Sequence, residues 1–121
     1  MLVTCPNVRK IKEFSTDGQL LRELTLPEDV VSPWHSIQLS SGEFIVCHGK
    51  DNDPVHRVCL IDSDGSVVRS FSGPAGSDSQ RMNVPGHMAV DRNGFVFVDD
   101  VYNSRVLLLS VNPAGVQIES T

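Results

Sequence analysis

The sequence is poor in several residue types, and each scarcity narrows the class of protein. It has three Ala against seventeen Val, and a single Trp and a single Tyr among 121 residues. Val favours strands, whereas Ala is the strongest helix former, so this ratio predicts an all-β fold. No apolar run approaches the roughly 18 residues of a membrane-spanning helix, and the first residues lack the segments of a secretory signal. We therefore expect no membrane association.

Basic residues are fewer than acidic ones. Ten Lys and Arg stand against fifteen Asp and Glu, which gives a formal net charge of −5. A protein that binds nucleic acid normally has a basic face that neutralises phosphates, so this balance disfavours RNA and DNA as partners. With 40% hydrophobic and 21% charged residues, the composition is that of a folded globular chain, and the length suits one domain.

Cysteine is scarce, and its spacing shows no pairs. Cys5, Cys47 and Cys59 are odd in number and form no C-x-x-C motif. Small secreted domains held by disulfides usually have an even and denser set, so we predict three free thiols in strands and a cytoplasmic location. Cys47 and His48 lack the second pair of ligands that would make a zinc site.

The sequence repeats itself with a period close to 48 residues. Three segments align with their first residues 47 and 48 positions apart, and each has a basic residue, a short apolar strand and a turn closed by Gly. A second kind of segment interleaves with them, from Pro33 to His48 and from Pro85 to Asp100. Short strands at such a period are typical of β-propeller blades rather than of a sandwich. The three segments are KIKEFSTDG (10–18), RVCLIDSDG (57–65) and RVLLLSVNPAG (105–115).

Turns that contain Gly divide each repeat into four short strands. The innermost strands are expected at Ile37–Leu39 and Met88–Val90, and Leu2–Thr4 is interpreted as the second strand of a blade that lacks its first. We therefore predict one partial blade at residues 1–26 and two full blades at 27–73 and 74–121, all within one incomplete propeller. The other expected strands are Phe44–Cys47, Phe95–Val98, Val58–Ile61, Val106–Leu109, Leu20–Leu24, Val67–Phe71 and Val116–Ile118.

The segment VPGHMAVDRNGFVFVDDVYNSRVLLL resembles the NHL repeat, whose pattern is roughly P-x-G-I-A-V-D-x-x-G-N-I-Y-V-A-D-x-x-N-x-R-I-x-V-F. His87 departs from it at a glycine position and Asp99 at an alanine position. The residues that fall on the pattern are Pro85, Ala89, Val90, Asp91, Gly94, Val98, Asp100, Asn103, Arg105 and Val106.

The preceding blade resembles the repeat more loosely, since it keeps Gly42, Val46 and Arg57 but has His48 where the pattern has Asp. The resemblance implies a propeller, usually of six blades, of the kind often found at the C-terminus of TRIM-type ubiquitin ligases. It implies a protein-interaction scaffold that recognises substrates and is not itself an enzyme, because ligase activity would reside in other domains. Two alternatives stay open, an RNA-binding NHL propeller and a metal-dependent lyase or lactonase on a related propeller.

The lengths of the expected connections indicate one binding surface, independently of the resemblance. The turns from strand one to two and from three to four are minimal, whereas the connections from two to three and from four to the next blade are long and polar. Both long classes emerge on one face of a propeller, and loops on a rigid scaffold commonly carry function. We predict that this face binds a protein partner, because its acidic loops disfavour RNA. The candidate residues are Trp34, His35, His48, Asp51, Asp53, His56, Arg81, His87, Asp99, Asp100, Tyr102 and Asn103.

His35 and His87 each lie two residues after a Pro, near the expected channel end of an innermost strand. Amidating lyases with a related propeller have zinc-binding histidines close to this position. Two histidines are fewer than the three protein ligands of a usual catalytic zinc, and the strand phase that aligns Ile37 with Met88 offsets His35 from His87 by one residue. We therefore predict ordinary channel or loop histidines, and no metal or cofactor.

Other polar residues are interpreted as parts of turns or closures. In Asp62–Gly65 the Gly comes two positions early for a calcium loop, so a turn is expected, and the acidic cluster at 51–53 is expected to be a solvated turn. Asn103 and Arg105 are expected to close their blade through hydrogen bonds. Trp34 either packs between blades or serves as an exposed anchor for a partner.

The expected strand count has a consequence for assembly. Eleven strands are one short of three blades, and an open set of blades exposes an apolar face at each end. Exposed apolar surfaces of that size mark interaction or aggregation sites. The chain is therefore either a piece of a longer propeller, which we favour, or it self-associates, with two copies closing head to tail into a ring.

Overall fold

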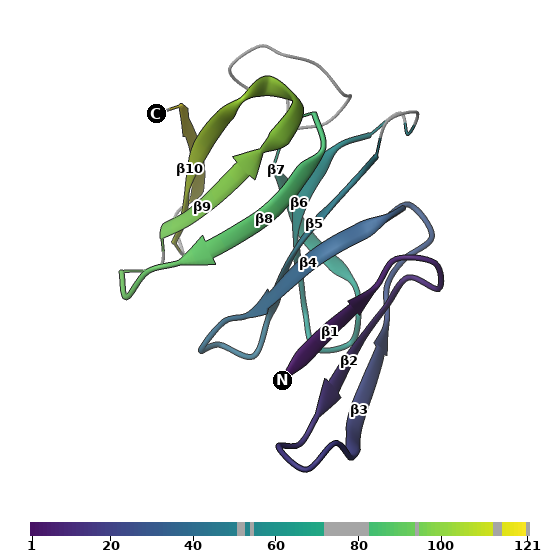
Figure 1. Ribbon diagram of the computed structural model, residues 1–121. Helices are drawn as coiled ribbons and strands as arrows, with labels where there is room; N and C mark the ends of the chain where they lie inside the picture. The colour runs from purple at the N-terminus through teal and green to yellow at the C-terminus, as the bar shows by residue number, and fades with distance from the viewer. Residues whose placement is uncertain (51–52, 54, 72–82, 94, 113–114, 121) are drawn as a thin grey trace.

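A computed structural model describes residues 1–50, 53, 55–71, 83–93, 95–112 and 115–120. Within these ranges the chain forms eleven β-strands, one 3₁₀ turn and no α-helix, which confirms the predicted all-β class. The strands form three antiparallel sheets of three, four and four strands, and each strand pairs with its neighbours in the sequence. This is the strand order of propeller blades, and the three sheets fan out from one region in Figure 1.

The first sheet, which has three strands as expected, contains β1 (Leu2–Cys5), β2 (Lys10–Phe14) and β3 (Leu20–Thr25). The second contains β4 (Pro33–Gln38), β5 (Phe44–His48), β6 (Arg57–Ile61) and β7 (Val67–Phe71). The third contains β8 (Pro85–Val90), β9 (Phe95–Asp100), the 3₁₀ turn η1 (Val101–Asn103), β10 (Arg105–Asn112) and β11 (Gly115–Ser120). The strands β1, β4 and β8 lie next to one another where the sheets meet (Figure 1). The blade boundaries after residues 26 and 73 stay predictions.

The innermost strands begin earlier than expected. β4 and β8 start at Pro33 and Pro85, several residues before the predicted starts. The residue before each proline, Ser32 or Val84, has a left-handed backbone with φ of +50° or +55°, and this conformation turns the chain sharply. Proline lacks the backbone N–H that pairs a residue inside a strand, so the prediction began each strand after its proline. A proline can nevertheless be the first residue of a strand, as both are here.

Two hydrophobic layers hold the sheets together, and the second sheet lies between them. All five residues of β5 and four of the five residues of β6 are buried, which explains why both strands are continuous apolar runs. The layer between the first and second sheets consists of Ile11, Leu26, Val30, Phe44, Val46, Cys59 and Ile61. The layer between the second and third sheets consists of Ile45, Cys47, Val58, Leu60, Met88, Val96, Val98, Leu107 and Leu109.

The three cysteines are free thiols, as predicted. Cys47 and Cys59 lie on neighbouring strands but on opposite faces of the second sheet, one in each hydrophobic layer. Burial raises the pKa of the Cys47 thiol to about 12 and that of Cys59 to about 11, so neither ionises near neutral pH. Within the described ranges, no helix has the length and hydrophobicity to cross a bilayer. The cytoplasmic location stays a prediction.

The short connections share one hydrogen-bonded turn. In the turn after β6, Asp62 N–H donates to the Ser66 carbonyl oxygen at 3.0 Å, and Gly65, with φ of +90°, donates back to the Asp62 carbonyl oxygen at 3.0 Å. The Asp62 carboxylate accepts from the backbone N–H groups of Asp64 and Ser66 at 2.9 and 3.0 Å. These contacts make the segment a turn, as predicted. The same bond across the turn occurs at Ser15–Gln19, Leu39–Glu43 and Asp91–Phe95.

Candidate functional site

The antiparallel strand order places the long connections at one end of each sheet. We call this the long-loop end; its described residues are 26–32, 49–50, 53, 55–56, 83–84 and 101–104. Hydrogen bonds tie the connections together there. The Trp34 indole N–H donates to the Gly49 carbonyl oxygen at 2.6 Å, and Gly49 N–H donates to the Ser32 carbonyl oxygen at 3.2 Å. In the third sheet, Val101 N–H donates in the same way to the Val84 carbonyl oxygen at 3.1 Å.

A β-bulge follows at the same place in both four-stranded sheets. The register shifts between Pro33 and His35 in β4, and between Pro85 and His87 in β8. His35 and His87 are therefore equivalent positions, each paired with the penultimate residue of the second strand. The offset of one residue between them, predicted from strand phase, is wrong because the residue of β4 equivalent to the buried Met88 is the buried Ser36, and not the apolar Ile37.

The two histidines lie beside each other at the start of adjacent innermost strands. Their ring centroids are 5.5 Å apart, with the planes inclined at 52°. His35 Nδ1 accepts a hydrogen bond from Met88 N–H at 3.1 Å, so the ring proton of neutral His35 is on Nε2. Burial and the neighbouring His87 lower the pKa of His35, and this imidazole is therefore neutral at pH 7. His35 is half-buried and His87 is exposed, which pairs a neutral N–H donor with an accessible imidazole.

Three other predicted residues have exposed side chains. Trp34 is 41% exposed and Tyr102 is 58% exposed, and Asp99 is also exposed. The bond from Trp34 to Gly49 fixes the indole while leaving much of its surface open, which favours the exposed anchor over burial between blades. Rigid aromatic side chains with open surface are frequent anchors in binding sites.

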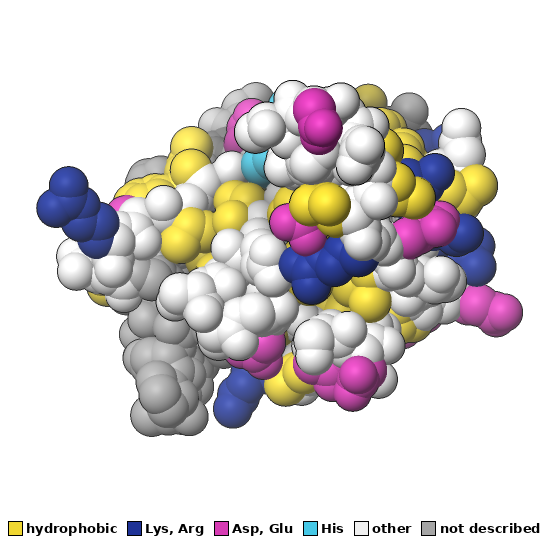
Figure 2. All heavy atoms as spheres, turned by 90° about the horizontal axis from the view of Figure 1, so that it is seen from below, with side chains coloured by type: hydrophobic (Ala, Val, Ile, Leu, Met, Phe, Trp, Pro, Cys, Tyr) yellow, Lys and Arg dark blue, Asp and Glu magenta, His cyan; other side chains and the backbone are white. Residues whose placement is uncertain are grey.

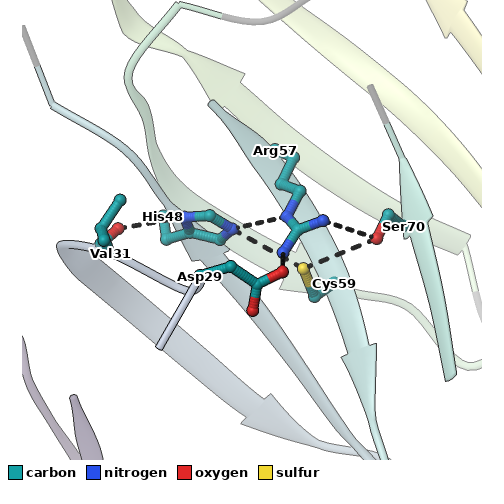
Figure 3. A network of polar contacts seen from close by, with 6 residues as sticks. All are labelled: Asp29, Val31, His48, Arg57, Cys59 and Ser70. Atoms are coloured by element: carbon teal, nitrogen blue, oxygen red, sulfur yellow. Dashed lines mark hydrogen bonds and ion pairs between the residues drawn. The ribbon is translucent and has the colours of Figure 1, made fainter. Parts of the chain in front are cut away.

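His48, by contrast, is buried at the centre of a polar network (Figure 3). Its Nδ1–H donates to the Val31 carbonyl oxygen at 3.0 Å, and its Nε2 accepts from Arg57 Nε–H at 2.8 Å. The Arg57 guanidinium also donates to Ser70 Oγ at 3.1 Å and to the Asp29 carboxylate at 3.0 Å. Burial and the Arg57 charge lower the pKa of His48 to about 4, so it is neutral and able to accept. The network fastens the connection before β4 to the second sheet.

Cys59 lies beside this network, with its Sγ 3.7 Å from His48 Nε2 (Figure 3). A cysteine next to a histidine is the arrangement of a nucleophilic dyad, but a dyad needs a free nitrogen that takes the thiol proton. The Nε–H of Arg57 already donates to that nitrogen, and burial raises the pKa of Cys59. The contact is therefore part of the packing of the sheet.

His56 is also fully buried, and it links two connections. Its Nε2–H donates to the Asp53 carbonyl oxygen at 2.9 Å, and its Nδ1 accepts from Val84 N–H at 2.7 Å. The Asp53 carboxylate accepts from Lys50 N–H at 3.0 Å. His56 thus holds the left-handed residue that precedes β8, and it acts on the histidine pair only through the backbone.

Asp100 and Asn103 bond to each other in the third sheet. The buried Asp100 carboxylate accepts from the Asn103 side-chain amide at 2.8 Å and from Asn83 N–H at 2.6 Å. Arg105 pairs with Asp100 in the strand register, but its side chain lies outside the described residues, so its predicted part in closing the blade stays a prediction.

The remaining predicted residues, Asp51 and Arg81, lie outside the described residues, and their roles stay predictions. In the part of the chain that the structure describes, no three His, Cys, Asp or Glu side chains gather as a metal-binding group. Sequence reasoning missed the residues that position the histidine pair, namely Val84 and the donor Met88. The only signal in the sequence was the proline that follows the left-handed residue.

The fold defines the class of protein: three consecutive blades of a β-propeller. No protein-family model and no curated protein sequence matches the chain. Among solved structures, virginiamycin B lyase from Staphylococcus aureus superposes with a TM-score of 0.62 over 96% of this chain, at 15% identity. A streptogramin B lyase structure gives 0.64 over 98%, at 16% identity. A catalytically inactive variant of the Staphylococcus aureus lyase, with a histidine replaced by alanine and with quinupristin, gives 0.61 over 96%, at 16% identity.

These likenesses establish the propeller fold and no more, because the identities are low. The chain covers 35%, 38% and 36% of the three neighbours. The predicted propeller is confirmed, whereas the NHL and TRIM-type assignment stays a prediction. The prediction that the chain is not an enzyme is wrong: it rested on the resemblance to propellers of ubiquitin ligases, whereas these solved structures of the same fold are lyases.

Proposed function

We propose that the long-loop end binds a small ligand and that, in an elimination reaction, His87 moves a proton between two of its atoms while His35 donates a hydrogen bond. The observation that carries this proposal is the histidine pair itself, with ring centroids 5.5 Å apart on adjacent innermost strands. The lyase neighbours support it, since one of them is inactive when a histidine is replaced by alanine.

The surroundings of the two imidazoles give each a role. His87 is exposed and would take a proton from a ligand carbon as a general base, while the bond from the adjacent carbon to a leaving oxygen breaks with its electron pair. The proton on His87 then passes to that oxygen, and a carbon–carbon double bond forms. His35 stays neutral because its pKa is lowered, and its Nε2–H would donate to the oxygen on which negative charge develops.

Quinupristin serves as the probe for this proposal, because the lyase variant was crystallised with it. The product of elimination is separated chromatographically and detected by the absorbance of its new double bond. We expect each of His87→Gln and His35→Gln to lower the rate by about 100-fold, the first through loss of general acid–base catalysis and the second through loss of a donor to the developing charge. The matched control is Asp64→Asn, an exposed residue at the opposite end of the sheet, which should keep the full rate.

Binding is measured separately from turnover through the fluorescence of Trp34, the only Trp in the chain. Both histidine variants should bind quinupristin within a few-fold of the unchanged protein. A chain that neither binds nor converts quinupristin, or histidine variants with the full rate, would contradict the proposal.

A protein-binding role is the second candidate, and the exposure of Trp34 and Tyr102 favours it. In this role the two rings would enter pockets of a partner, and the histidines would only contribute contact area. Peptides selected from a display library against the unchanged chain should lose binding to Trp34→Ala and Tyr102→Ala but keep it to His87→Gln. The opposite pattern would refute this role.

A further inference from the structure

Among the residues that the structure describes, the second sheet is covered on both faces, whereas the first and third sheets each have one face that no described element covers. Along β9 the burial alternates strictly, so every second residue points away from the second sheet. We call this side of the third sheet the forward face; it includes Phe95, Phe97, Asp99 and Val106. Phe95 is 36% exposed, Phe97 38% and Val106 40%.

The forward face has a buried counterpart in the second sheet. His48 pairs with Arg57 as Asp100 pairs with Arg105, so the two sheets can be aligned position by position. The counterparts are all fully buried against the third sheet. The aligned pairs are Ile45 with Phe97, Cys47 with Asp99, and Val58 with Val106.

The uncovered side of the first sheet, which we call the rear face, has buried counterparts as well. It includes Val3, Lys12, Phe14 and Glu23, and Val3 is 37% exposed. By the same alignment, the residues of the third sheet at the equivalent positions face the second sheet. The aligned pairs are Val3 with Val98, Lys12 with Leu107, and Phe14 with Leu109.

Unlike their buried counterparts, the two faces carry charged side chains. The forward face carries Asp99 where the second sheet has Cys47, and the rear face carries Lys12 where the third sheet has Leu107. Glu23 on the rear face pairs with Lys10 at 2.8 Å and lies opposite Lys12 in the strand register, so two ammonium groups stand against one carboxylate and the charge here is net positive. Figure 2, which looks at the molecule from below, shows apolar side chains at the surface between charged side chains of both signs.

Opposite charges set into apolar faces favour one pairing over the others. A contact between two forward faces would place two Asp99 carboxylates together, and a contact between two rear faces would place two Lys12 ammonium groups together. Forward against rear brings apolar side chains into contact and matches the two charges.

We propose that the forward face of one molecule docks on the rear face of a second copy, head to tail, with Asp99 opposite Lys12. The contact repeats the packing between the second and third sheets. It is heterologous, because each molecule uses two different surfaces, so it closes into a ring or continues as a short series.

Light scattering coupled to size exclusion, over a range of concentrations, tests the contact. The unchanged chain should associate, and Asp99→Lys or Lys12→Asp alone should weaken association at least about tenfold, because each creates a like-charge contact. An equimolar mixture of the two variants should associate again, since each then offers the other a matching face. Asp64→Lys and Lys50→Asp are the controls, both exposed and outside the two faces, and they should associate normally.

Circular dichroism confirms that each variant keeps its strands, and Phe97→Asp serves as a second variant of the forward face that should also dissociate the complex. A ring and a short series both support the contact if they respond to the charge reversals. A monomer at every concentration, association that the reversals leave unchanged, or a mixture that stays dissociated would overturn it.

Discussion

Protonation of His48 should destabilise the chain in mild acid. His48 Nε2 accepts from Arg57 Nε–H, so a proton on that nitrogen removes the hydrogen bond and places two N–H donors face to face. Burial disfavours the charged imidazolium most, and the Arg57 charge adds repulsion, which the carboxylates of Asp29 and Asp53 oppose only in part. The folded state therefore binds this proton less readily than the unfolded state does.

The size and direction of the effect follow from the pKa of His48, which falls from an ordinary 6.5 to about 4 on folding. The stabilisation is fully present above pH 6.5 and is lost as the pH falls, because the unfolded chain binds the proton first. At 1.36 kcal/mol per pKa unit, the free energy of unfolding should decrease by about 3 kcal/mol between pH 6.5 and 4. That is a large fraction of the stability of an ordinary domain.

Urea denaturation at a series of pH values measures this loss, and His48→Gln removes the titrating group. The difference in unfolding free energy between the unchanged chain and this variant should shrink by about 3 kcal/mol from pH 6.5 to 4, whatever the carboxylates contribute. The NMR signal of the His48 ring should titrate near pH 4 in the folded chain. Parallel pH profiles for the two proteins, or a ring that titrates near 6.5, would refute the reasoning.

Two further predictions concern Gly49 and the cysteines. Gly49→Ala should lower the unfolding free energy by about 3 kcal/mol, because φ is +115° and an added Cβ would lie 2.8 Å from His56 Cα; an unchanged urea midpoint would contradict this. Thiol titration should return three thiols in denaturant. In the folded chain, the buried Cys47 and Cys59 should react far more slowly than Cys5, and equal rates would count against the described burial.

The strands could be predicted because their determinants are local. The apolar runs at Phe44–Cys47 and Val58–Ile61 needed only enough length and flanking Gly, and both became strands of the doubly covered second sheet. The turn at Asp62 was equally accessible, because an Asp side chain bonds backbone N–H groups two and four residues later. Because the predicted strands recur at a fixed period, they indicated propeller blades rather than another all-β fold.

The site was harder to predict because it depends on backbone features without a sequence signal. The bulge before His35 shifts the register by one residue, and the left-handed conformation of Val84 is rare for a β-branched residue. His48 looked like a loop residue because it is polar and ends a strand. Its burial depends on Arg57, which pairs with it across the sheet.

The left-handed residue before β4 and β8, and the bulge at the start of each strand, repeat from one blade to the next while the residue in the bulge changes. The extra residue of the bulge is Trp34 in one blade and Gly86 in the next, so the same backbone accepts the largest and the smallest side chain. A Cβ at Gly86 would meet only the side chain of Val101, at 3.0 Å. The surface at this position can therefore change while the buried layers that hold the sheets together stay the same.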